Sequence, residues 1–125
     1  MLIEILDGGM GYELNKYYSD FGKDALENNI DLITHIYNEF VKAGCEYITT
    51  CNYTCRPSLD DNWENNTKIT IKIAQSVKAS NTNICICCSL PPYNKSYANY
   101  EIDDNFNERL VREKNKQTLD LINQF

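Results

Sequence analysis

The hydrophobic pattern of this chain switches three times from a short apolar run to a segment of helical periodicity, and this alternation restricts the fold more than any other feature of the sequence. Short apolar runs predict strands, and apolar residues that recur every three or four positions predict helices. The strands are expected at 2–6, 47–50 and 84–88, and the helices at 24–43, 69–78 and 106–125. Because strands that alternate with helices pair in parallel through right-handed crossovers, the sequence predicts an α/β fold made of parallel βα units.

The ends of these elements carry their own signals. Gly44 follows the first helix as a stop signal, and Pro91 and Pro92 end the third apolar run because proline cannot donate a ladder hydrogen bond. The run at 84–88 is continuous, which is typical of a strand that is buried on both faces.

Length and charge limit both the number of domains and the class of partner. With 125 residues, the chain is long enough for one domain, 1–125. Its 18 acidic and 12 basic side chains give a net charge of −6, which argues against nucleic-acid binding, since that needs clustered Lys and Arg. No apolar run approaches the ~20 residues of a membrane span, and no signal peptide is visible at the N-terminus. We therefore expect a cytoplasmic protein that binds neither membranes nor nucleic acids.

Six cysteines raise the question of disulfides or a metal site. In a chain without a secretory signal we expect reduced thiols, which behave as small buried hydrophobes. The alternative is a soft-metal site at the Cys-x-Cys-Cys run. Alternation along a strand would place Cys85 and Cys87 on one side and Cys88 on the other, which is poor geometry for one ion. His35, the sole histidine, lies in the middle of the first helix, where a surface or packing role is expected.

The carboxyl ends of parallel strands are where function collects in α/β folds, and an unusual segment follows each predicted strand. After the first comes Asp7-Gly8-Gly9. A carboxylate there can accept hydrogen bonds from an ammonium group, and the glycines permit positive φ and a close approach of a ligand to backbone N–H groups. A plain turn is the alternative, because Asp-Gly is a common turn pair.

The second and third segments are 49–53 and 89–93. Polar side chains that close the second apolar run could point into the mouth of a barrel, and Tyr53 could cover a small ligand with its ring. The alternative for this segment is a polar strand end that caps the next loop. The two prolines of the third segment could shape a pocket wall. A proline ligand for a WW or SH3 module is disfavoured there, since the prolines follow a buried strand directly.

The order of these segments resembles the homocysteine S-methyltransferase family. The resemblance rests on 5–11 (ILDGGMG), 43–50 (AGCEYITT) and 89–92 (SLPP), with Ser96-Tyr97 just beyond. It implies the first three units of a TIM (β/α)8 barrel, truncated and open, because a full barrel takes ~250 residues. It also implies that homocysteine, or a related small amino acid, is bound by Asp7, Gly8 and Gly9, with Thr50 and Tyr53 lining the same pocket.

Members of that family hold the homocysteine thiol on zinc as a thiolate, which takes a methyl group and gives methionine. The resemblance places the zinc ligands in units that are absent from this chain, so no catalytic or metal-binding residue is assigned here. Three strands leave two sheet edges without partners. We therefore expect a marginally stable fragment that is inactive by itself, and that associates with a C-terminal half-barrel polypeptide or with itself. A split enzyme and a non-catalytic amino-acid-binding or interaction fragment remain the alternatives.

Overall fold

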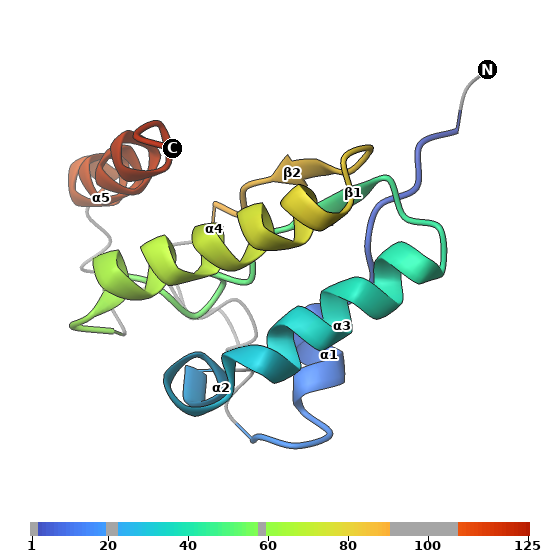
Figure 1. Cartoon of the computed structure of the whole chain (residues 1–125). Helices are drawn as coiled ribbons and strands as arrows, with labels where there is room; N and C mark the ends of the chain where they lie inside the picture. The colour runs from blue at the N-terminus through green and yellow to red at the C-terminus, as the bar shows by residue number, and fades with distance from the viewer. Residues whose placement is uncertain (1–2, 20–22, 58–59, 91–107) are drawn as a thin grey trace.

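A computed structural model describes residues 3–19, 23–57, 60–90 and 108–125 of the chain (Figure 1). Its elements are five helices and two strands within these ranges: α1 (Met10–Leu14), α2 (Lys23–Asn28), α3 (Ile30–Lys42), β1 (Tyr47–Thr49), α4 (Trp63–Ser80), β2 (Cys85–Cys87) and α5 (Glu108–Ile122). Several residues used in the sequence-based predictions lie outside the described ranges: Pro91, Pro92, Ser96, Tyr97 and Phe106. The α/β order is confirmed.

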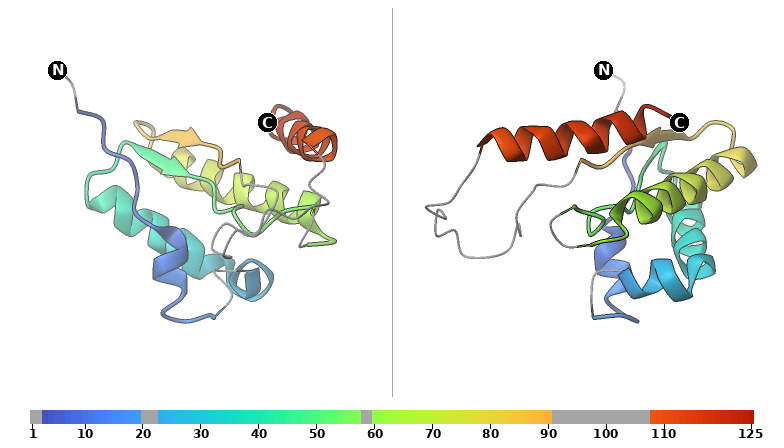
Figure 2. Two further views of the ribbon diagram at one scale, coloured as in Figure 1. Left: turned by 180° about the vertical axis from the view of Figure 1, so that it is seen from behind. Right: turned by 90° about the vertical axis from the view of Figure 1, so that its left-hand side faces the viewer.

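The sheet is parallel and open, as expected. β1 pairs with β2, with Tyr47 opposite Cys85 and Thr49 opposite Cys87. On its other side, β1 meets the N-terminal segment through one parallel bridge between Leu6 and Tyr47. In Figure 2 the N-terminal segment and β2 flank β1 on its two sides.

The prediction of a full strand at 2–6 is wrong for the described residues 3–6. Hydrogen bonds join Ile5 O to the Glu46 and Tyr47 amides, and the Asp7 amide to Tyr47 O, but the pairing does not extend further. Ile5 and Leu6 are 51% and 57% exposed. Regular strand pairing is short here because the described residues provide neither a second neighbouring strand nor a covering layer for this segment.

The core lies between one face of the sheet and the helices α3 and α4. Ile48 of β1 is fully buried, and the partly buried Ile86, its partner in β2, packs against the same cluster. From the helices, Tyr37 and Val77 contribute to this core. Figure 1 shows α4 running along the strands with α3 beside it. The opposite face is not covered by any described helix, so Cys85 is exposed, and the prediction of a third strand buried on both faces is wrong.

The first predicted helix, 24–43, is two helices in the structure. Asn29 interrupts it with φ −152° and ψ 63°, and its side-chain oxygen accepts a hydrogen bond from the Leu32 amide at 3.1 Å. This is an N-cap, which satisfies a free amide of the first turn of α3 and so starts a new helix. The stop at Gly44 is confirmed: it follows the last turn with φ +100°.

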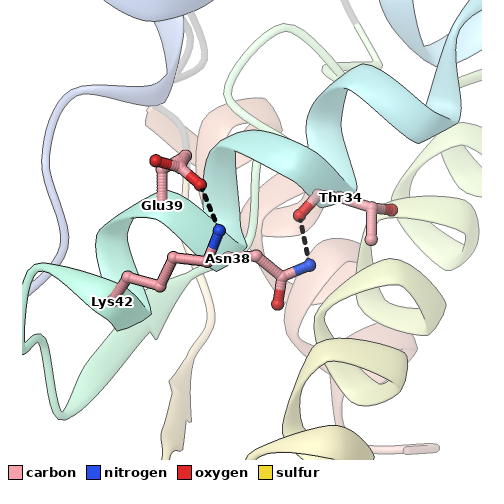
Figure 3. A network of polar contacts seen from close by, with 4 residues as sticks. All are labelled: Thr34, Asn38, Glu39 and Lys42. Atoms are coloured by element: carbon pink, nitrogen blue, oxygen red, sulfur yellow. Dashed lines mark hydrogen bonds and ion pairs between the residues drawn. The ribbon is translucent and has the colours of Figure 1, made fainter.

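The outer face of α3 is polar and internally bonded (Figure 3). Lys42 Nζ pairs with Glu39 Oε1 at 2.7 Å, and Asn38 Nδ2 donates to Thr34 O at 3.0 Å. His35 is exposed on the same helix, in agreement with the expected surface role.

The other two predicted helices are confirmed with different bounds. α4 begins at Trp63, six residues before its first apolar repeat at Ile69, because its first turns bury polar Asn66 and Thr67 against the fold. α5 packs against α4 and buries only Thr118 and Leu121. No helix within the described ranges combines the length and apolar character that a bilayer crossing requires.

The cysteines divide by position. All six are free. Cys45 and Cys55 are buried core thiols as expected, and Cys51 and Cys87 are partly buried. Cys85 and Cys88 are exposed, which differs from the expectation of core thiols.

Candidate functional site

A cavity of about 570 Å³ lies at the carboxyl ends of the three parallel segments, where their following loops meet. It is lined by 6–12, Asn15, 49–51, Tyr53 and Ser89. The structure therefore brings Asp7, Gly8, Gly9, Thr50 and Tyr53, all five residues singled out from the sequence, to one rim.

Asp7 is tied to the end of β1. Its Oδ2 accepts a hydrogen bond from the Thr49 amide at 2.8 Å, and its Oδ1 accepts one from Thr49 Oγ1 at 3.0 Å. Burial raises the pKa of the Asp7 carboxyl above its ordinary value, while these two hydrogen bonds act in the opposite direction. Each carboxylate oxygen retains acceptor capacity, so the group can still receive a cationic donor from the cavity.

The two glycines serve different purposes. A Cβ added to Gly8 would lie 2.7 Å from Cε1 of Phe40, so Gly8 lets the loop pass close to α3. At Gly9 the nearest atom to such a Cβ is Tyr12 Cβ at 3.6 Å, an ordinary contact. Neither glycine uses the positive φ that the sequence reasoning allowed; in the described part of the chain that conformation is found at Gly44.

Thr50 joins the second loop to the third. It is 3% exposed, and its hydroxyl donates to Asn52 Oδ1 at 2.7 Å while it accepts from the Ser89 amide at 2.9 Å. Asn52, 1% exposed, completes this link by donating from Nδ2 to Ser89 O at 2.9 Å. Thr50 thus contributes to the cavity wall with its hydroxyl engaged within the protein.

The sequence singles out the segment 49–53 but indicates no role for Thr49 or Asn52, which bind the neighbouring loops. The available signal was the cluster of polar side chains directly after an apolar strand, but nothing local shows which of them faces the ligand and which binds a neighbouring loop. Asp7–Thr49 and Asn52–Ser89 together join all three loops.

Tyr53 stands at the wall with its ring against a cation. The Arg56 guanidinium carbon lies 5.3 Å from the ring centroid, and Arg56 is buried. Such cation–π packing fixes the ring plane, so the side of Tyr53 that meets the cavity is held in place.

The cysteine thiol at the cavity is not reactive at neutral pH. Cys51 lines it, and burial raises the pKa of the Cys51 thiol to about 11 against the effect of its hydrogen bond with Tyr37. At neutral pH this thiol is therefore protonated and a poor nucleophile or metal ligand. Across the described ranges no three His, Cys, Asp or Glu side chains are grouped to hold a metal ion. A zinc ion does not fit the residues described here.

Comparison with known proteins gives one family and one fold. The family model for homocysteine S-methyltransferase matches residues 4–122. A solved structure, the metallated form of the homocysteine methyltransferase MmuM from Escherichia coli, superposes with a TM-score of 0.73 at 19% identity. The match covers 95% of this chain and 50% of that one, so the chain spans about half the length of the solved structure. No curated protein matches significantly. Because the family model extends over nearly the whole sequence, the chain belongs to the homocysteine S-methyltransferase family.

Proposed function

We propose that this chain forms the amino-acid-binding part of a homocysteine S-methyltransferase. The observation that carries the proposal is the half-buried Asp7 carboxylate at the rim of the cavity, in a chain of this family. The Asp7 carboxylate receives the ammonium group of homocysteine. Gly8 and Gly9 line the cavity with their backbone, against which the amino-acid part of the ligand lies. Thr50 shapes the wall, and Tyr53 covers the ligand with its ring.

The cavity supports a small ligand. At about 570 Å³ it falls within the range of roughly 300–1,000 Å³ that is usual for small-molecule sites. A single small amino acid leaves room in such a volume. This fits a site where a methyl donor must come within reach of the amino-acid sulfur.

Methyl transfer forms a bond from sulfur to the methyl carbon, breaks the bond from that carbon to the donor, and releases the thiol proton. A bound zinc ion supplies the ionised thiolate in such chemistry. The described residues do not provide its ligands. We therefore assign amino-acid recognition to this chain, and methyl transfer to an assembly with further βα units, in the same polypeptide or in a second one.

The test compares two ligands and two variants by isothermal titration calorimetry. L-homocysteine is expected to bind the chain, and 4-mercaptobutyrate, which lacks the amino group, to bind at least about tenfold more weakly, as expected for losing a hydrogen bond between charged groups. Asp7→Asn should lose affinity for L-homocysteine by a similar factor. Asp31→Asn, at an exposed position of α3, is the matched control and should bind like the wild type.

The same titration with EDTA present separates recognition from metal chemistry. Binding that persists in EDTA and depends on Asp7 supports the proposal. Equal affinity of the wild type and Asp7→Asn for L-homocysteine would refute it.

A further inference from the structure

The carboxylate of Asp7 is held on both oxygens by a single residue of the neighbouring strand. Thr49 donates its backbone N–H to Oδ2 at 2.8 Å and its hydroxyl to Oδ1 at 3.0 Å. The Asp7 amide itself donates to Tyr47 O at 2.9 Å. Both the main chain and the side chain of Asp7 are therefore fixed relative to β1, which leaves the carboxylate little freedom to rotate.

Thr49 is fixed in turn by a buried tyrosine behind it. Tyr37 of α3 is 0% exposed, and its hydroxyl donates to Thr49 O at 2.7 Å. The next amide, that of Thr50, donates to Cys87 O at 2.9 Å. Both polar groups of the peptide unit that follows Thr49 thus have defined partners, so the backbone that presents the two donors to Asp7 is held directly beside them.

We propose that Thr49 is the positioning residue of this site, which aims the remaining lone pairs of Asp7 into the cavity, and that Tyr37 fixes Thr49 for this purpose. An ionised carboxylate has about four acceptor positions. Thr49 occupies one acceptor position on each carboxylate oxygen. The same two hydrogen bonds determine where the remaining acceptor positions point. The inference rests on the proposed function, because the group that Asp7 receives is the ammonium of the amino acid.

The surroundings of Asp7 give Thr49 a second effect. The titratable groups that interact electrostatically with Asp7 in the described part of the chain are Tyr37, Cys45 and Cys51. Burial raises the pKa of all three, so they are neutral at neutral pH. The two hydrogen bonds from Thr49, together with one from the backbone of Asp7 itself, thus lower the pKa of the Asp7 carboxyl against the effect of burial.

The first experiment needs no ligand. The Asp7 carboxyl is titrated by ¹³C NMR, with its signal assigned through Asp7→Asn. In Thr49→Val, which keeps the shape and the N–H but loses the hydroxyl, the pKa of Asp7 should rise by about one unit. Thr49→Ser should restore the wild-type value. Thr34→Val removes a hydroxyl that bonds only Ile30 O on α3, and it should change nothing.

Circular dichroism shows whether each variant folds. If Thr49→Val does not, Tyr37→Phe replaces it, with an expected shift in the same direction of smaller size. A pKa of Asp7 in the folded variant that equals the wild-type value overturns the inference.

The second experiment measures binding of L-homocysteine and 4-mercaptobutyrate across a pH series. Thr49→Val should weaken homocysteine binding about tenfold, leave 4-mercaptobutyrate unaffected, and have no effect in an Asp7→Asn background. Loss of affinity for both ligands alike, or no loss for homocysteine, overturns a positioning role. Absence of homocysteine binding by the wild type refutes the proposed function instead, and the NMR titration still tests the contact between Thr49 and Asp7.

Discussion

Replacing Asn52 with alanine is expected to detach the loop after β2 from the loop after β1. The Asn52 side chain is 1% exposed and makes two hydrogen bonds, from Nδ2 to Ser89 O and from Thr50 Oγ1 to its own Oδ1. Alanine removes both. The Ser89 carbonyl then loses this donor, and the Thr50 hydroxyl loses this acceptor while it still accepts from the Ser89 amide.

The expected loss of stability follows from the Ser89 carbonyl and the Thr50 hydroxyl, which each lose a hydrogen-bond partner. A buried donor or acceptor that loses its partner costs about 1–3 kcal/mol. Ser89 is only half-buried, so water can replace part of its loss, whereas Thr50 is almost fully buried. We therefore expect a decrease of roughly 2–4 kcal/mol in the free energy of unfolding. For a domain with a stability of about 5–15 kcal/mol this is a large share.

Urea unfolding followed by circular dichroism measures the effect. With a slope of about 2 kcal/mol per molar urea, the midpoint should fall by roughly 1–2 M. The matched control is Asn38→Ala, which removes one hydrogen bond to Thr34 O on the outer part of α3 and should stay within about 0.5 kcal/mol of the wild type. A midpoint for Asn52→Ala that equals that of Asn38→Ala would refute the reasoning that the rim depends on this side chain.

Three further outcomes follow from the same contacts. Gly8→Ala should lower the free energy of unfolding by about 1–3 kcal/mol, since its Cβ would overlap the ring of Phe40, whereas Gly9→Ala should change it by less than about 0.5 kcal/mol; equal thermal melts would contradict this. The raised pKa of Asp7 means that its contribution to stability is fully present below the unfolded value near 3.8 and is lost as pH rises through the folded pKa. The stability of the wild type relative to Asp7→Asn should therefore decline with pH across that window in urea titrations, and a flat difference would show that the pKa is not raised. Cys51, with a pKa raised to about 11, should remain unalkylated by iodoacetamide at pH 8 after the exposed thiols have reacted, as mass spectrometry would show; labelling at the rate of exposed thiols would contradict its burial.

The order of elements could be predicted from the sequence because it depends on local periodicity. Periodicity does not predict the bounds or the burial of an element where these depend on a tertiary contact or a capping side chain. Asn29 divides the first helix because its side chain competes as an N-cap, although apolar spacing continues across it. β2 is covered on one face only, which a continuous apolar run cannot reveal, since Cys85 and Ile86 are both apolar letters.

Some residues of the site could likewise be located from local sequence, and others could not. Asp7, Gly8 and Gly9 could be located as rim residues because the carboxyl ends of parallel strands share one edge. The role of Asn52 could not, because its partner Ser89 is 37 positions away and is set by the register of β1 against β2. The same holds for Thr49, which is 42 positions from Asp7.

The contacts described for the rim separate two parts of the proposed chemistry. Thr49 fixes Asp7, and Asn52 fixes the third loop, and these residues all belong to the described ranges. In contrast, these ranges supply no cluster of ligands for a metal that could ionise a substrate thiol. We therefore propose that recognition of the amino-acid end belongs to the first βα units of the fold, and we expect it to survive when metal is removed. On this proposal, activation of the sulfur belongs to the further βα units of the assembly.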